Sequence, residues 1–351
     1  MHLLVLRFSA MGDVALAAPV MKSLLQKNPD LQITFVSQKH FEPFFSEIPR
    51  LRFYPIELKN KHKGINGLYR FQKKLKKEID FDFVIDLHSV IRTRILCFFL
   101  SLSGLKYFRI DKGRKEKRRL VRRKNKQLKP LKHTTERYLD VFKSLELNLP
   151  SSNLPNITAP KSALVSLQEN LNQLIDSSKD KWWIGIAPFA RHREKTLPLT
   201  TIAKLIQLLN SELNTKILLF GGGKDEIQQL ETLHQSYPYT INVAGKLSLS
   251  EELTLMQQLD VMISMDSSNM HMASLLGTNV VSVWGATHPF AGFGTVGKNE
   301  LNVIQVSTQE LPCRPCSVFG NKPCWRKDHA CMERITPVEV LDKVKSVLEK
   351  V

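Results

Sequence analysis

The stretch that decides the fold is MHLLVLRFSAMGDVALAAPVM, Met1–Met21. Its run Leu3–Leu6 is short, apolar and typical of a buried strand. Apolar side chains then recur at helical spacing, at Val14, Ala17, Ala18, Met21, Leu24 and Leu25. They predict an amphipathic helix, and Ile33–Val36 and Phe83–Ile85 predict two further strands. A strand–helix–strand start implies a parallel sheet with helices on its faces.

The same rhythm restarts after a Pro-rich linker. Within eleven residues the chain has Pro150, Ser151, Ser152, Asn153, Pro155 and Pro160. Later apolar runs predict four strands, Trp183–Ala187, Ile217–Phe220, Val261–Met265 and Val280–Trp284. We therefore expect an α/β chain with one domain at 1–150, a linker at 151–160, a second domain at 161–336 and a C-terminal helix at 337–351. Two such halves leave a cleft between their sheets, and ligands bind at the carboxyl ends of the strands.

Composition limits the class of protein. The chain has 351 residues, 42% hydrophobic and 24% charged, which suits a soluble protein of two domains. A disulfide miniprotein, a coiled coil and a largely disordered chain are excluded. The longest apolar stretch, Ile95–Leu105, is about half the roughly 20 residues that a membrane-spanning helix needs. The N-terminus lacks a basic region and is interrupted by Arg7 and Asp13, so we expect no signal peptide. The prediction is a cytoplasmic protein with peripheral membrane contact.

The positive charge is concentrated in one segment. The chain carries a net charge of +18, and Lys112–Lys132 contributes +11 of it, with twelve Lys or Arg and one acid, Glu116. Such a run favours an anionic partner: phosphorylated lipid, nucleic acid or a membrane surface. The alternative is a solvated basic loop that aids solubility. Stacking on nucleic-acid bases is disfavoured because the segment has no Phe, Tyr or Trp.

The turn after the first predicted strand is the first candidate site. It runs from Arg7 to Val14, where Gly12 permits a tight backbone turn and Asp13 lies at the start of the predicted helix. Asp13 has two interpretations. It is either a carboxylate that faces the cleft and removes a proton from a hydroxyl group, or an N-cap of the helix.

A basic loop follows the strand Trp183–Ala187. It contains Arg191, His192, Arg193 and Lys195. Arginine makes bidentate contacts to phosphate and lysine supplies a compact charge, so the loop suits an anionic ligand. The alternative is an exposed polar loop.

A glycine-rich turn follows the next strand, at Gly221, Gly222 and Gly223. Three glycines allow a nucleotide to approach the backbone closely. The turn matches neither the dinucleotide-binding pattern nor a P-loop, so an ordinary strand-to-helix turn is the alternative.

The strand Val261–Met265 ends in Asp266, Ser267 and Ser268, and a helix follows. Free N–H groups and hydroxyls at a helix start form an anion site, with His271 in the first turn. The alternative is an ordinary helix cap with a packed histidine. The later motif Trp284–Pro289 follows another strand and favours the same edge of the sheet.

Four of the five cysteines lie within 19 residues, at Cys313, Cys316, Cys324 and Cys331. Their clustering permits a structural zinc site. Free packed thiols are a second interpretation, and redox function or disulfides are a third, although disulfides are disfavoured in a reducing cytoplasm. Cys97 lies in an apolar run and is predicted to be in the core.

These motifs occur together in one family. The chain resembles the bacterial lipopolysaccharide heptosyltransferases, family nine of the glycosyltransferases, nearly from end to end. The resemblance rests on R-x-S-x-x-G-D-V at Arg7–Val14, the Lys195 loop, the D-[ST]-x-x-x-H segment at Asp266–His271, and G-x-T-x-P at Gly285–Pro289. It implies a GT-B fold, with two Rossmann-like domains that face a central cleft.

The resemblance implies roles for individual residues. Asp13 matches the proposed catalytic base, and Lys195 matches the lysine that contacts the donor diphosphate. The full expected donor set is Lys195, Arg191, Asp266, Ser267, Ser268, His271, Gly221 and Gly222. The expected acceptor set is Ser9, Gly12, His88 and Arg92. The chain departs from the family's Asp-Thr-Gly loop at Ser267 and Ser268, which keep a hydroxyl but stiffen the turn.

The resemblance implies an inverting transfer of heptose from ADP-heptose to the inner core of a lipopolysaccharide precursor. No cofactor is expected for catalysis. The expected partners are the nucleotide-sugar donor, an anionic glycolipid acceptor and the inner-membrane surface, contacted through Lys112–Lys132; no nucleic acid is expected. The alternatives are another nucleotide-sugar donor, an acceptor-free reaction such as epimerisation, and a basic nucleic-acid-binding protein.

Overall fold

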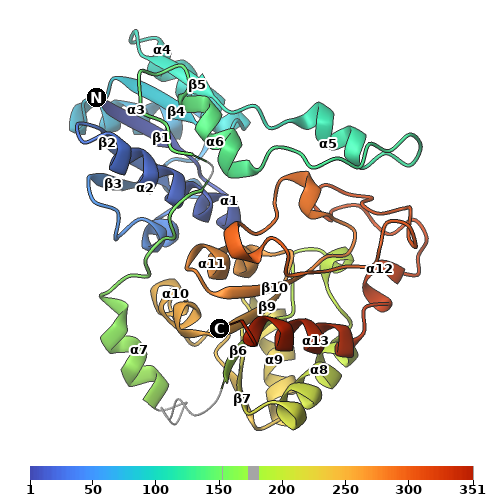
Figure 1. The fold of residues 1–351 in the computed structure, drawn as a ribbon. Helices are drawn as coiled ribbons and strands as arrows, with labels where there is room; N and C mark the ends of the chain where they lie inside the picture. The colour runs from blue at the N-terminus through green and yellow to red at the C-terminus, as the bar shows by residue number, and fades with distance from the viewer. Residues whose placement is uncertain (152, 173–181, 351) are drawn as a thin grey trace. The chain divides into compact units, whose positions relative to one another are not determined.

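The computed structural model describes residues 1–151, 153–172 and 182–350 (Figure 1). Ser152 of the predicted linker and residues 173–181 of the predicted second domain lie outside the described residues. By its contacts the chain divides into two compact units. The first unit contains Met1–Gly113 and Lys132–Thr158, and the second contains Arg114–Leu131 and Ala159–Val351.

The first unit is built on a five-stranded parallel sheet in the order β3-β2-β1-β4-β5. The strands are β1 His2–Leu6, β2 Gln32–Ser37, β3 Leu51–Pro55, β4 Phe83–Asp86 and β5 Lys106–Arg109. The run Leu3–Leu6 is fully buried as the central strand, which is why it is apolar on both faces. This strand order is that of a Rossmann-type sheet.

Helices connect these strands. They are α1 Met11–Ala15, α2 Ala17–Lys27, α3 Gly64–Glu78, α4 Ile91–Ser101 and α6 Thr134–Phe142, with a 3₁₀ helix, η1, at Lys39–Phe44. The single helix predicted near the N-terminus is interrupted at Leu16, so it forms two segments. Its predicted apolar face is buried.

The second unit has a six-stranded parallel sheet in the order β11-β10-β9-β6-β7-β8. The strands are β6 Trp182–Ala187, β7 Thr215–Leu219, β8 Thr240–Asn242, β9 Val261–Met265, β10 Asn279–Val283 and β11 Val303–Ile304. This is again the Rossmann order. The two sheets confirm the α/β fold class that the sequence predicts.

The second unit contains two helices that precede its first strand, α5 Arg114–Leu120 and α7 Ala163–Asn172, and further helices between and after its strands. These further helices are α8 Leu199–Glu212, α9 Lys224–Ser236, α10 Leu249–Gln258, α11 Ser268–Leu275, α12 Ala330–Glu333 and α13 Pro337–Leu348. Short 3₁₀ segments are η2 Arg193–Lys195, η3 Pro289–Ala291 and η4 Gly297–Asn299. The predicted C-terminal helix is α13, and its apolar face packs into the same core as α8.

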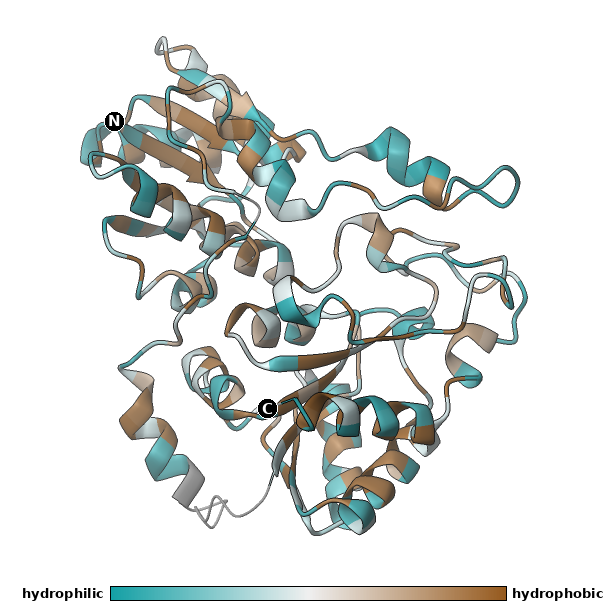
Figure 2. Cartoon of the chain, viewed as in Figure 1, coloured by the Kyte–Doolittle hydropathy of each residue, from teal (hydrophilic) through white to brown (hydrophobic). Residues whose placement is uncertain are grey.

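Each sheet carries its own hydrophobic core. Figure 2 shows the central strands of both sheets mostly in hydrophobic colours and α5 mostly in hydrophilic colours. One core packs Leu4 and Leu6 of β1 against Leu68 and Phe71 of α3. The other surrounds the strands of the second sheet. Among the described residues, no helix has the length and apolar character needed to cross a membrane.

The basic segment Arg114–Leu131 packs with the second unit, although the sequence places it in the domain 1–150. The Lys126 ammonium donates to three backbone carbonyls, those of Pro312 at 2.9 Å, Cys313 at 2.9 Å and Arg314 at 2.6 Å. Lys117 also lies 4.0 Å from the ring centroid of Phe293. Lys117 and Lys126 thus anchor the segment to the second unit. Most of its other Lys and Arg side chains are exposed.

Candidate functional site

Asp13 lies at the carboxyl end of β1. It stands in the first turn of α1, whose N-cap position is Ala10, so Asp13 is not the N-cap. Its carboxylate pairs with the Arg7 guanidinium at 2.6 Å, and the Asp13 side chain keeps 27% exposure while Arg7 is buried. Arg7 also donates to the Leu87 carbonyl at 2.6 Å. The arginine is fixed from two sides, and it holds a solvent-reachable carboxylate in one position.

Tyr138 supports this pair from α6. Its hydroxyl donates to the Asp13 carbonyl at 3.0 Å, and Arg7 lies over its ring, 5.8 Å from the centroid. The tyrosine is fully buried, and this burial raises the pKa of its hydroxyl. A neutral, buried tyrosine therefore supports the Asp13 backbone and the Arg7 side chain, and Arg7 in turn orients the Asp13 carboxylate.

The loop after β4 brings the predicted acceptor residue His88 next to the Asp13 turn, because β4 and β1 are neighbours. His88 Nδ1 accepts the Phe8 N–H at 3.3 Å, and its Nε2 lies 3.5 Å from the Ser9 hydroxyl. Burial and the nearby Arg7 charge lower the pKa of His88 to about 3. The imidazole is therefore neutral near pH 7, with its N–H at Nε2 directed toward Ser9.

Buried Asp86 organises the same loop. It accepts hydrogen bonds from the His88 N–H at 3.0 Å, the Ser89 N–H at 2.7 Å and the Thr93 hydroxyl at 3.1 Å. The two N–H groups share Asp86 Oδ1, while the Thr93 hydroxyl shares Oδ2 with the Arg109 guanidinium, which lies 3.2 Å from it. Of the remaining predicted acceptor residues, Gly12 is buried in α1 and Arg92 is exposed at the start of α4.

Lys195, Asp266 and Thr287 form a cluster in the second unit, at the carboxyl ends of β6, β9 and β10. The Lys195 ammonium donates to the Asp266 carbonyl at 2.6 Å and lies 3.3 Å from its carboxylate. Thr287 donates to the same carboxylate at 2.7 Å. Hydrogen bonds thus join three motifs that are separate in the sequence, and the Lys195 side chain among them keeps 12% exposure.

The helix α11 begins at this cluster. Its N-cap residue, Ser267, has its hydroxyl 3.2 Å from that of Ser264 and makes no capping bond, and Ser268 is the first helical residue. The N–H groups of the first turn therefore face the same edge as Lys195. His271 is buried within the first turn of α11, as predicted, at 8% exposure.

The glycine-rich turn follows β7, next to β6 in the sheet. The Gly222 N–H donates to the Glu226 carboxylate at 2.9 Å, and Gly223 has a positive φ of 91°. A side chain at Gly221 would meet Leu230 at 2.7 Å. Packing against Leu230 is therefore enough to explain a glycine at position 221, and no ligand is needed to explain it. Arg191 is exposed on the neighbouring loop.

Arg314 is a structural residue that the sequence does not single out. It is 1% exposed and donates to the carbonyls of Gly285 at 2.5 Å, Trp284 at 2.9 Å and Thr287 at 3.2 Å. Burial lowers its pKa to about 10. Arg314 therefore fixes the loop that carries Thr287, and only its position between two predicted cysteine ligands marks it in the sequence.

The four clustered cysteines line one small cavity of about 20 Å³. All are free thiols, and burial raises the pKa of Cys331 to about 12. Cys97 is fully buried in the first core, as predicted. Among the described residues, no group of three His, Cys, Asp or Glu side chains is arranged to hold a metal ion.

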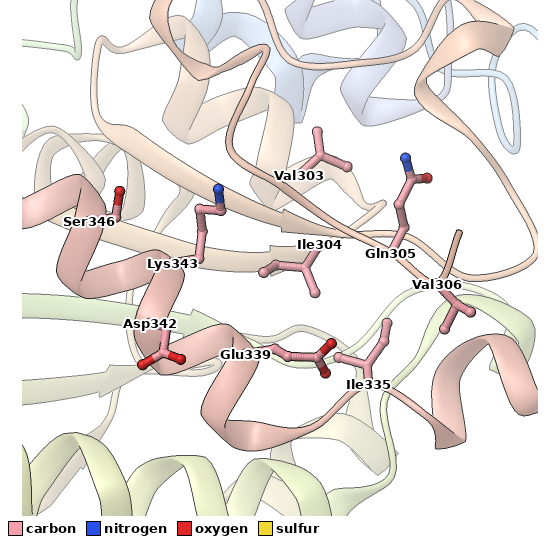
Figure 3. Close-up of a pocket in the computed structure, with 9 residues that line it drawn as sticks. All are labelled: Val303, Ile304, Gln305, Val306, Ile335, Glu339, Asp342, Lys343 and Ser346. Atoms are coloured by element: carbon pink, nitrogen blue, oxygen red, sulfur yellow. The ribbon is translucent and has the colours of Figure 1, made fainter. Parts of the chain in front are cut away.

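A second cavity lies elsewhere in the second unit. It has a volume of about 430 Å³, between the edge strand β11 and α13, and Figure 3 shows Glu339, Asp342 and Lys343 on its helical side. None of the predicted site residues lines it. We do not assign this cavity to the reaction.

Two Rossmann-like units, one with a held carboxylate and one with an ammonium group beside a helix start, define the GT-B class of glycosyltransferases. Residues 68–321 match glycosyltransferase family 9 (heptosyltransferase), and the chain belongs to this family. The resemblance stated from the motifs is therefore confirmed.

Individual proteins agree with this assignment. The chain is 26% identical over 316 residues to the lipopolysaccharide core heptosyltransferase OpsX of Haemophilus influenzae, covering 87% of this chain and 84% of OpsX. Its fold is similar to that of a glycosyl transferase family 9 protein from Veillonella parvula, with a TM-score of 0.79 and 19% identity. The match covers 100% of this chain and 98% of the Veillonella chain. The fold is also similar to that of E. coli heptosyltransferase WaaC with ADP-2-deoxy-2-fluoro heptose, with a TM-score of 0.65 and 19% identity. This match covers 100% of this chain and 99% of the WaaC chain.

Proposed function

We propose that this glycosyltransferase moves heptose from ADP-heptose to the inner core of a lipopolysaccharide precursor, either Kdo-lipid A or heptosyl-Kdo-lipid A, with inversion at the anomeric carbon. The observation that carries the proposal is the cluster of Lys195, Asp266 and Thr287 beside the start of α11. The names of OpsX and of the WaaC complex support a lipopolysaccharide-core acceptor and an ADP-heptose donor.

The donor diphosphate binds in the second unit. The Lys195 ammonium and the N–H groups of Ser267 and Ser268 supply positive charge at the place where the leaving diphosphate gains negative charge. A lysine in this position fulfils the role of a divalent cation, so the proposed transfer needs no metal. Arg191, Gly221, Gly222 and His271 complete the proposed donor set.

Asp13 in the first unit acts on the acceptor. The acceptor hydroxyl oxygen attacks the anomeric carbon, the bond from that carbon to the diphosphate oxygen breaks, and the hydroxyl proton passes to the Asp13 carboxylate. Attack from the face opposite the leaving group inverts the configuration. Arg7 orients the base, while Ser9, Gly12, His88 and Arg92 are the proposed acceptor contacts.

A nucleotide panel tests the donor assignment. The melting temperature of the purified chain is measured with ADP, UDP, GDP, CDP and dTDP, each with and without EDTA. Preferential stabilisation by ADP that survives EDTA is the expected result, and Lys195→Met should abolish it. Preference for another nucleotide would overturn the ADP-heptose donor while leaving the family unchanged.

The basic segment carries the proposed attachment to the inner face of the inner membrane. Its exposed cations include Arg118, Arg122 and Lys124, while Lys126 anchors the backbone. Each basic residue near an anionic surface contributes about 1 kcal/mol. Reversing the charge of the three exposed residues with glutamate should release the chain from anionic vesicles. Unchanged vesicle binding would contradict the attachment.

A structural zinc at the four cysteines is a separate proposal. Four thiols around one cavity are the ligand type that zinc prefers, although binding would have to draw their sulfur atoms closer together. Metal analysis of the purified chain tests it, with Cys331→Ser as the variant and Cys97→Ser as the matched control. If the wild type contains no zinc, the zinc proposal is wrong and the four cysteines are packed as free thiols.

A further inference from the structure

The helix α4 exposes large apolar side chains along one line. Ile91 is 75% exposed, Phe98 58% and Leu102, the residue after the helix, 70%. At about 100° per residue these three positions fall within about 40° of one another around the helix. The opposite side of α4 is fully buried at Leu96 and Leu100. Ile91, Phe98 and Leu102 are referred to below as the α4 stripe.

The apolar surface continues onto α3, which packs beside α4 (Figure 1). The Phe98 and Phe99 rings are 6.0 Å apart, and Phe99 meets Tyr69 of α3 at 5.4 Å, edge to face. Tyr69 is 42% exposed, and the Lys73 ammonium lies 4.7 Å from its ring centroid. Ring contacts thus connect Phe98 of the α4 stripe to Tyr69, and through Tyr69 to the Lys73 ammonium.

The charge around this surface has one sign. The helix α3 carries five Lys or Arg and one acid, Glu78, and that acid pairs with Lys74 at 3.7 Å. The helix α4 carries two arginines, Arg92 and Arg94, and no acid. An occupant of the α4 stripe therefore meets apolar side chains rimmed by positive charge.

We propose that the α4 stripe and the adjoining face of α3 dock onto an anionic lipid bilayer. Protruding Phe and Leu side chains enter the boundary between headgroups and acyl chains, Tyr69 lies at the headgroup level, and the lysines contact phosphates. The positive rim complements anionic lipid. It would repel an equally basic second copy of the same face.

The position of the stripe suits the proposed function, on which this inference rests. The helix α4 starts directly after the loop that holds His88, and Arg92 lies in its first turn. From Ile91 to Leu102 the helix advances about 16 Å. A glycolipid with its acyl chains in the bilayer beside Phe98 would keep its sugar within reach of the proposed acceptor residues.

The test is co-sedimentation of the full chain with vesicles that contain phosphatidylglycerol. The double variant Phe98→Gln and Leu102→Gln should bind at least about tenfold more weakly than the wild type, since each removed side chain loses burial in the bilayer. The matched control is Leu301→Gln, which removes an 87% exposed leucine in the second unit and should bind like the wild type. Circular dichroism checks that all variants remain folded.

Four outcomes test the docking of the α4 stripe on a bilayer against its competitors. Equal vesicle binding by the double variant and the wild type overturns it. A wild-type dimer that the double variant dissociates, with vesicle binding unchanged, would show that a second copy covers the stripe. Transfer to a deacylated, water-soluble acceptor should be unchanged in the double variant. A wild type that binds vesicles through the stripe but transfers no heptose would refute the proposed function and leave the docking surface standing.

Discussion

Gly320 provides a way to move Lys195 without removing its charge. A methyl group at Gly320 would stand 2.6 Å from Lys195 Cγ and 2.8 Å from Cδ, well inside the 3.5–4.0 Å of a normal carbon contact. The lysine stem would have to shift by about 1 Å to relieve this overlap. Its ammonium would then leave the Asp266 carbonyl, now at 2.6 Å, and the carboxylate at 3.3 Å.

Gly320→Ala is expected to lower both the folding stability and the binding energy for ADP. The backbone at Gly320 has φ of 77°, and alanine there costs about 1–2 kcal/mol of folding stability. Misplacing a charged hydrogen-bond donor costs a further 1.5–3 kcal/mol or so of binding energy at the diphosphate. We therefore expect Gly320→Ala to weaken ADP affinity by about 10- to 100-fold.

Isothermal titration with ADP measures the effect. Gly297→Ala is the matched control, because Gly297 has φ of 62° and nothing within 4 Å of the added methyl group. It should lose stability but keep its ADP affinity. In a Lys195→Ala background, Gly320→Ala should cost no further affinity. An equal loss of ADP affinity in both backgrounds, or a loss as large in Gly297→Ala, would show that Gly320→Ala does not act through Lys195.

Three further predictions concern the framework of the site. Asp86→Ala should destabilise the chain by about 3–5 kcal/mol in urea unfolding, because it leaves buried donors and the Arg109 charge without their acceptor; a loss below 1 kcal/mol would contradict this. Stability should fall as pH drops below 6.5, by about 1.4 kcal/mol per unit from His88, since its pKa of about 3 means that protons bind the unfolded state preferentially; His88→Asn should flatten the profile between pH 4 and 6.5, and an unchanged slope would argue against it. Lys126→Met should speed proteolysis within Arg114–Leu131 by freeing three carbonyls, whereas Lys129→Met, an exposed neighbour, should not.

The central strands could be predicted from the sequence and the edge strands could not. The seven predicted runs all fall on β1, β2, β4, β6, β7, β9 and β10, which lie inside the two sheets. The four unpredicted strands, β3, β5, β8 and β11, are the four sheet edges. Edge strands are short and partly exposed, as β5 is throughout Lys106–Arg109, so no continuous apolar run marks them.

The contacts of the candidate site were less predictable than its residues. Strand order is what places His88 beside Ser9, and Thr287 beside Asp266, and no local pattern encodes strand order. The N-cap interpretation of Asp13 is wrong because the helix starts two residues earlier, at Met11. The role of Arg314 cannot be predicted from the sequence, because its partners are backbone carbonyls, which every residue has.

In the proposed mechanism, Asp13 accepts the proton of the attacking hydroxyl. Asn has the same shape but cannot accept that proton, so Asp13→Asn separates chemistry from binding. The measurement is heptose transfer from ADP-heptose to Kdo-lipid A, followed by mass spectrometry, together with ADP-heptose affinity for the wild type and the variant. We expect Asp13→Asn to bind ADP-heptose within about twofold of the wild-type affinity and to have a kcat lower by about 10²- to 10⁴-fold. A variant that transfers heptose at a near wild-type rate would contradict this role of Asp13.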